Sequence, residues 1–123
     1  MTGTTRSIVE QYWRAAQKRD WPDFGGLLHE DVVYDLPQTR ERIRGRAAYI
    51  EFNRTYPGNW SLELESVLGD MDHAVSRVRF TIDGDEATGI TFFDFKDGLI
   101  ARITDYWPEP YTAPARPVPT ERY

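Results

Sequence analysis

The stretch Leu99–Trp107, LIARITDYW, has the alternation of a strand, and the Asp97-Gly98 pair before it is typical of a tight hairpin turn. Alternate residues of a strand share a face, so one face is expected to hold Leu99, Ala101, Ile103, Asp105 and Trp107, and the other Ile100, Arg102, Thr104 and Tyr106. A carboxylate in an apolar row is either paired or takes part in chemistry, because burying it alone is costly. The sequence therefore predicts a pocket with Asp105 in its wall.

Working back from this stretch, the sequence predicts three more long strands. Apolar and polar residues alternate over residues 60–68, and turn signals at 69–72 and 83–85 delimit further strands over 74–82 and 86–96. Together with residues 99–107 these strands are expected to form an antiparallel meander.

The N-terminal part has helical spacing instead. A first helix is expected to begin after Thr4 and to run to about Arg19, and a second is capped by Asp20 and ends at residues 29–31. A short strand follows over 32–36, then a polar loop over 38–46 that contains four arginines, then a third helix from residue 47. This order predicts an α+β fold, with helices covering one side of a curved antiparallel sheet.

The C-terminal segment differs from the rest of the chain. Five of the eight prolines fall in residues 108–119, and so proline-rich a segment cannot form a regular element. We expect one domain over residues 1–110 and an extended tail over residues 111–123, lying on the surface or on a neighbouring subunit.

Composition excludes several classes of protein. A net charge of −5 argues against binding to nucleic acid or an anionic membrane, and no apolar run has the length of a signal peptide or a membrane span. The chain has no cysteine, which removes disulfides and thiolate catalysis. No metal-ligand spacing and no glycine-rich phosphate loop occur, so no cofactor is expected. The sequence predicts a soluble, cytoplasmic protein, and its four Trp, seven Tyr and six Phe suit a lined cavity or a thick core.

The element order, with VEQYWRAAQKRDW near the start and GLIARITDYW at the end, resembles the SnoaL-like branch of the nuclear-transport-factor-2-like superfamily. That superfamily includes polyketide cyclases, ketosteroid isomerases, limonene-epoxide hydrolases and scytalone dehydratases. The resemblance covers about residues 5–110. It implies a cone-shaped, cystatin-like α+β barrel. Members of the superfamily share the pocket of this fold but catalyse different reactions.

The resemblance also implies roles for single residues. Asp35, in Val33-Tyr34-Asp35-Leu36-Pro37, falls on the proton-shuttling base of ketosteroid isomerases, and Tyr12 falls on their oxyanion tyrosine. Their second oxyanion donor, an aspartic acid, corresponds to about Thr91, so this chain departs from the isomerase pattern there. Asp105, in Asp-Tyr-Trp, resembles the aspartate that polyketide cyclases and epoxide hydrolases use as general acid or base.

Each of these residues also has a purely structural interpretation. Asp105 could be paired with Arg79 or Arg77, Asp35 could be a turn aspartate, and Tyr12 could be a core residue. If Asp35 and Asp105 shared the cavity, each would raise the pKa of the other, which would give one acid and one base near neutral pH.

Two functions follow as hypotheses. The first is a cofactor-independent enzyme that acts on a small, hydrophobic, oxygenated molecule by aldol cyclisation, isomerisation or water addition. Asp105 and Asp35 would transfer protons, and Tyr12 or Arg79 would stabilise negative charge. The second is a binding or dimerisation module without catalysis. A homodimer is expected, because the open face of the sheet needs a cover. The residues expected in the pocket wall are Trp13, Tyr34, Phe52, Tyr56, Thr91, Phe93, Ile103 and Trp107.

Overall fold

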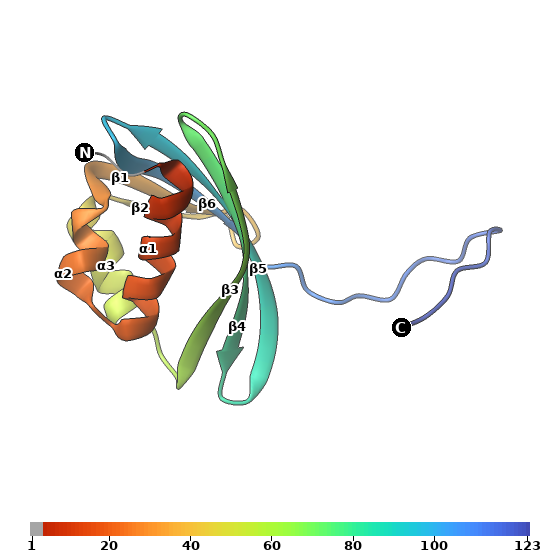
Figure 1. The fold of residues 1–123 in the computed structure, drawn as a ribbon. Coiled ribbons are helices and arrows are strands. Elements are labelled where there is room, and N and C mark those ends of the chain that lie inside the picture. Colours follow the sequence, from red (N-terminus) through yellow and green to blue (C-terminus); the bar gives the residue numbers. More distant parts are fainter. Residues whose placement is uncertain (1–3) are drawn as a thin grey trace.

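A computed structural model describes residues 4–123 and contains three helices packed on one face of a curved, six-stranded sheet (Figure 1). The helices are α1 (Thr5–Lys18), α2 (Trp21–Gly26) and α3 (Arg46–Arg54). The strands are β1 (Leu28–Leu36), β2 (Glu41–Arg44), β3 (Trp60–Gly69), β4 (His73–Ile82), β5 (Asp85–Lys96) and β6 (Leu99–Tyr106). The predicted α+β class with three N-terminal helices is confirmed.

The sheet has the order β2-β1-β6-β5-β4-β3 and does not close into a barrel. All neighbouring strands are antiparallel except β1 and β6, which run parallel. The prediction of a wholly antiparallel sheet is therefore wrong at this pair. Parallel neighbours need a long connection between them, and here residues 37–98, with α3 and four strands, lie between β1 and β6.

The two first helices begin at side-chain caps. The Thr4 hydroxyl accepts a hydrogen bond from the Ser7 amide, and the Asp20 carboxylate accepts one from the Asp23 amide. Helix α1 ends where Arg19 adopts a left-handed φ of 59°. The sequence predicted that the second helix ends at residues 29–31, and this prediction is wrong. Helix α2 ends at Gly26, and residues 29–31 belong to β1. The glycine pair ends α2 early, because glycine is a poor helix former.

The arginine-rich segment is not simply a loop. Its residues 41–44 form β2, an edge strand whose Ile43 and Arg42 pair with Tyr34 and Asp35 of β1. A strand with one apolar residue among charges carries almost no hydrophobic alternation, which is why the sequence did not predict it. Charged side chains are a common protection for such an edge.

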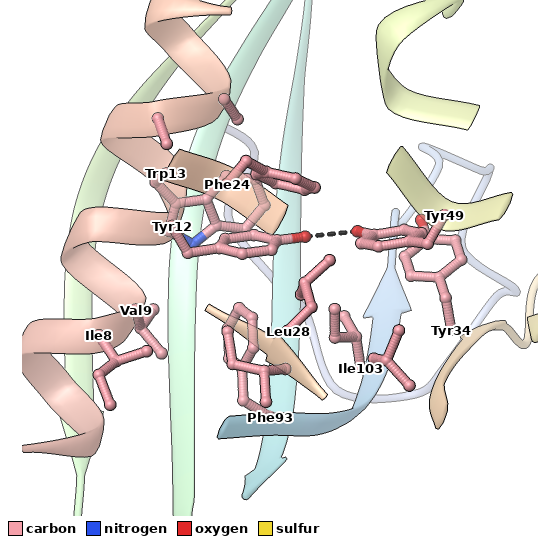
Figure 2. Packing of buried hydrophobic residues seen from close by; sticks show 14 of the residues in the cluster. Ile8, Val9, Tyr12, Trp13, Phe24, Leu28, Tyr34, Tyr49, Phe93 and Ile103 are labelled. Atoms are coloured by element: carbon pink, nitrogen blue, oxygen red, sulfur yellow. Dashed lines mark hydrogen bonds between the residues drawn. The ribbon is translucent and has the colours of Figure 1, made fainter. Parts of the chain in front are cut away.

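The core lies between the helices and the inner face of the sheet, and aromatic rings dominate it (Figure 2). The Tyr12 ring lies 4.8 Å from that of Phe24 and 5.2 Å from that of Phe93, measured between centroids. Ile100 is also fully buried, although strict alternation places it on the outer face. The reason is a shift of register between Asp94 and Phe95 on the neighbouring strand, which alters the pairing at the start of β6.

After β6 the chain forms no regular element, and the exposed segment from Pro108 onward runs away from the body of the protein (Figure 1). Within residues 4–123, no helix is both long enough and apolar enough to cross a membrane.

Candidate functional site

A cavity of about 430 Å³ lies between the helices and the inner face of the sheet. Its walls are rich in aromatic residues and come from α1, α3, the strands and the loops beside them. The aromatic lining residues are Tyr12, Trp13, Tyr34, Tyr49, Phe52, Tyr56, Trp60, Phe80 and Trp107. The other lining residues are Ala16, Leu36, Gln38, Thr39, Glu41, Asn53, Leu62, Ile82, Ala87, Asp105 and Glu109.

Asp105 lies at the inner end of this cavity and is only 5% exposed. Its two oxygens accept hydrogen bonds from neutral hydroxyl groups on the two neighbouring strands. The Tyr34 hydroxyl on β1 donates to Oδ2 over 2.6 Å, and the Thr91 hydroxyl on β5 donates to Oδ1 over 2.5 Å. Thr91 is the direct cross-strand partner of Asp105, which places its hydroxyl beside the carboxyl group.

Burial raises the pKa of Asp105 above its ordinary value, and hydrogen bonds from Thr91, Tyr34 and the Trp107 indole oppose that rise without cancelling it. No Lys, Arg or His within residues 4–123 forms an ion pair with this carboxyl group. The structural alternative, a pairing with Arg79 or Arg77, is therefore absent, since these arginines pair with Glu63 and Glu65. A carboxyl group held by neutral donors alone, beside an apolar cavity, can change its protonation state closer to neutral pH than an exposed aspartate.

Two buried tyrosine hydroxyls lie beside this group. Tyr12 of α1 and Tyr49 of α3 are hydrogen-bonded through their hydroxyl groups (Figure 2), and the ring of Tyr34 stacks on that of Tyr49 with 4.6 Å between centroids. Burial raises the pKa of Tyr12, Tyr34 and Tyr49, and the nearby charge of Asp105 adds to the rise in each. All three phenols therefore remain protonated donors at neutral pH.

Tyr49 was missing from the residues predicted for the site. It is the buried residue of α3, and it lies three residues before Phe52, which also lines the cavity. The spacing i, i+3 on a helix was the signal that could have identified it.

The structure does not bring Asp35 into the cavity. Along β1 the side chains of Tyr34 and Leu36 line the cavity, so Asp35 between them points to the outer face. There its oxygens lie 2.6 Å from Nε of Arg42 and 2.6 Å from Nη1 of Arg102. The hydrogen bond from Arg42, helped by the charge of Arg102, holds the pKa of Asp35 below its ordinary value.

Arg79 also lies outside the cavity. Its guanidinium is 2.7 Å from the carboxylate of Glu63 across the β3–β4 pair, on the face opposite the neighbouring Phe80. The predicted pair of carboxylates and the predicted arginine are therefore not brought together with Asp105.

Five of the eight residues expected in the pocket wall line this cavity, and three do not. Trp13, Tyr34, Phe52, Tyr56 and Trp107 line the cavity. By contrast, Thr91, Phe93 and Ile103 are fully buried and are not among its lining residues. Phe93 and Ile103 belong to the core, and Thr91 reaches the site only through Asp105.

The described residues contain no cluster of three or more His, Asp or Glu side chains that could hold a metal ion. His73 instead lies 2.8 Å from the carboxylate of Asp94 on the outer face, and His29 accepts a hydrogen bond from the Asp31 amide.

Comparison with known proteins agrees with the fold. Residues 9–103 match the SnoaL-like domain family. One similar crystal structure is that of a protein from Kribbella flavida, described as a candidate ketosteroid isomerase. Its sequence is 42% identical and its TM-score is 0.88, and the match covers 98% of this chain and 96% of that one. A candidate polyketide cyclase from Xanthomonas campestris is 28% identical, with a TM-score of 0.69, covering 83% of this chain and 88% of that one.

A third structure shares the fold alone. It is an epoxide hydrolase from M. tuberculosis, 21% identical with a TM-score of 0.71, covering 85% of this chain and 84% of that one. No curated protein sequence matches this chain at a significant level. Since the family match spans most of the chain, the protein belongs to the SnoaL-like domain family, whose fold is that of nuclear-transport-factor-2-like proteins.

Proposed function

We propose that the protein is a cofactor-independent acid–base catalyst for a small, hydrophobic, oxygenated molecule, and that Asp105 is its proton-transferring group. One observation carries this proposal: the carboxyl group of Asp105 is 95% buried and held only by neutral donors, yet it forms part of the wall of a cavity rich in aromatic rings. Burying an ionisable carboxyl group lowers the stability of the folded state, and carboxyl groups with perturbed pKa values in cavities are found most often at functional sites.

The chemistry follows from this environment. A general acid or base works best when its pKa lies near the working pH, and burial moves the pKa of Asp105 in that direction. In the ionised form Asp105 can take a proton from a carbon next to a carbonyl group, and it can return the proton at another position. Tyr34 and Thr91 fix the orientation of the carboxyl group, so they act as positioning residues.

The Tyr12–Tyr49 pair supplies the complementary group. Two hydroxyls carry two hydrogens, and their mutual hydrogen bond uses one of them. The other hydrogen is free to be donated to a ligand oxygen, which would stabilise the negative charge of an enolate as it forms. Because one carboxyl group and one donor suffice for enolisation, aldol cyclisation and isomerisation need fewer groups than water addition, which also requires a positioned water.

The relatives support the same class of chemistry. The protein from Kribbella flavida is described as a candidate ketosteroid isomerase, and the one from Xanthomonas campestris as a candidate polyketide cyclase. Both reactions proceed by proton transfer next to a carbonyl group. The distribution of carboxyl groups in this chain favours Asp105 over Asp35 for that step, because Asp35 lies on the other face of the sheet.

The test is the variant Asp105→Asn, assayed on a panel of cyclisable and enolisable ketones that the wild-type protein turns over. We expect turnover to fall by about 10²–10⁴-fold while ketone binding, followed by quenching of tryptophan fluorescence, is retained. Asp35→Asn is the matched control and should change turnover by less than about threefold, since its carboxylate lies outside the cavity. Retained turnover in Asp105→Asn would contradict the assignment, and binding without turnover in the wild-type protein would favour the binding module.

We also propose a homodimer formed through the outer face of the sheet. Phe92 and Tyr106 lie next to each other there, 48% and 42% exposed, with their rings 5.9 Å apart. Charges of both signs flank them, including Arg77 and Asp94, so two copies related by a two-fold axis can match opposite charges. The occupant we expect is a second copy of the chain, in a cytoplasmic protein.

Light scattering at micromolar concentration should give twice the chain mass of 14.3 kDa. Phe92→Asp should shift the mass to that of a single chain, because it places a charge in the apolar centre of the contact. Met71→Asp is the control: Met71 is 90% exposed in the β3–β4 turn, outside the Phe92 and Tyr106 pair. A wild-type mass near that of one chain would contradict the dimer.

A further inference from the structure

The ionisable groups that line the cavity, apart from the neutral phenols, are all acidic. Asp105 lies at the buried inner end, and Glu41 and Glu109 lie at the exposed rim. No Lys, Arg or His lines the cavity in the part of the chain that the structure describes. The ionised carboxyl groups of this lining contribute negative charge to the cavity, which disfavours a carboxylate or phosphate on the ligand and favours a positive charge.

Three rings of the cavity lining form a cluster suited to a cation. The Phe80 ring contacts those of Tyr56 and Trp107, with its plane at 90° to that of Tyr56 and at 64° to that of Trp107. The centroid distances are 6.1 Å and 5.4 Å, so the three rings are contiguous and differ in orientation. Aromatic faces carry partial negative charge and attract ammonium groups, most strongly when several rings surround the group.

The same cluster already binds one cation of the protein itself. The guanidinium carbon of Arg19 lies 3.4 Å from the centroid of the Trp60 ring, and Trp60 stacks on Phe80 with 6.0 Å between centroids. Trp60 also contributes to the lining of the cavity. Arg19 itself does not line the cavity, so this contact shows that one ring of the lining accepts a cation–π interaction.

From these observations we propose that the ligand carries a protonated amine or quaternary ammonium group, which lies between the rings of Tyr56, Phe80 and Trp107 and the exposed carboxylates of Glu41 and Glu109. The oxygenated part of the ligand then lies against Asp105. The inference rests on the proposed function in one respect, namely that this cavity is the ligand site; the charge of the ligand is independent of the reaction.

The test uses three probes with one compact skeleton: 1-adamantylamine, 1-adamantanol and adamantane-1-carboxylate. Their dissociation constants at pH 7 are measured by calorimetry and by quenching of the tryptophan fluorescence, since Trp13, Trp60 and Trp107 line the cavity. We expect the amine to bind about tenfold more tightly than the alcohol, and the carboxylate to bind most weakly.

Two variants locate the preference. Glu41→Gln/Glu109→Gln removes both rim charges without adding a buried group, and it should reduce the preference for the amine over the carboxylate by about tenfold while changing alcohol binding little. Glu30→Gln/Glu121→Gln is the matched control, because it changes the net charge equally at two exposed residues that do not line the cavity. The preference should persist there.

Equal or tighter binding of the carboxylate would overturn the inference, and so would a preference that survives the rim variant or vanishes in the control. Failure of all three probes to bind would also count against it. These outcomes are separable from failure of the proposed function, because turnover of neutral ketones that depends on Asp105 would remain when the preference for a cation is absent.

Discussion

Asp105 and Asp35 lie on neighbouring strands of one sheet, yet their environments are opposite. Asp105 on β6 faces inward, is 5% exposed, and accepts hydrogen bonds from two neutral hydroxyls. Asp35 on β1 faces outward between the guanidinium groups of Arg42 and Arg102. Burial raises the pKa of Asp105, whereas the hydrogen bond from Arg42 lowers the pKa of Asp35.

The difference arises because successive side chains of a strand point to opposite faces of the sheet. Tyr34 precedes Asp35 directly and points into the cavity, where it donates to Asp105. A shift of one residue in β1 would exchange the two, placing the aspartate beside Asp105 and the tyrosine among the arginines. The presence of one carboxyl group in the cavity, and not two, is therefore a consequence of strand register rather than of composition.

The largest effect on stability that we predict tests how tightly the inner face is packed around Asp105. A Cβ atom added to Gly89 would lie 2.6 Å from the indole ring of Trp107, which lines the cavity and supports the Asp105 carboxylate. Gly89→Ala should therefore lower the free energy of unfolding by about 1–3 kcal/mol and displace the Trp107 ring, as urea titration and the fluorescence spectrum would show.

Thr88→Ala is the control for this variant, because Thr88 is the exposed neighbour on the same strand. It should change the free energy of unfolding by less than about 0.5 kcal/mol. If both variants changed the free energy of unfolding by the same small amount, the inner face would have room to accept a methyl group. The claim that the inner face is packed more tightly than the outer face would then be wrong.

Much of this arrangement could be predicted from the sequence, and the exceptions have physical causes. The alternation of residues 99–107 correctly placed Asp105 on the same face as Ile103 and Trp107, because strand parity is a local property. The orientation of Asp35 was open to the same argument from Tyr34 and Leu36, but its likeness to the base of ketosteroid isomerases led to the opposite expectation.

Other features depend on contacts that no local pattern encodes. The parallel pairing of β1 with β6 joins segments that are far apart in the chain, and the buried position of Ile100 results from an irregular register with β5. The cavity requires the relative placement of α1, α3 and the sheet. The meeting of the Tyr12 and Tyr49 hydroxyls is a product of that placement.

The second prediction compares how Asp105 and Asp35 change the pH dependence of stability. The folded-state pKa of Asp105 is raised above the unfolded value of about 3.9, so the folded state loses stability as pH rises through the window between the two values. At neutral pH Asp105→Asn should therefore be more stable than the wild-type protein, and this gain should vanish below about pH 4.

Asp35→Asn should show the opposite sign. The folded-state pKa of Asp35 is depressed, so its stabilising effect is present above the unfolded value and is lost as pH falls through the folded value. The variant should be less stable than the wild-type protein at neutral pH and equal to it in acid, with a smaller effect because the partner arginines are half exposed. Urea titrations of all three proteins from pH 3 to 8 measure both trends, and two changes of the same sign would refute the contrast.

The smallest predicted effect concerns the hydroxyls that hold Asp105. Tyr34→Phe removes the donor to Oδ2 and leaves the Thr91 hydroxyl on Oδ1. Hydrogen bonds to the ionised form lower a carboxyl pKa, so losing one of them should raise the pKa of Asp105 further, as carbon-detected NMR titration of the aspartate carboxyls would show. The pH profile of turnover should move upward with it, whereas a residue that serves only packing would lower the rate without moving the profile. Tyr106→Phe, on the outer face of β6, should leave both unchanged. If the titration of Asp105 stayed in place in Tyr34→Phe, its protonation would be set by burial alone, and Tyr34 would be no more than a wall of the cavity.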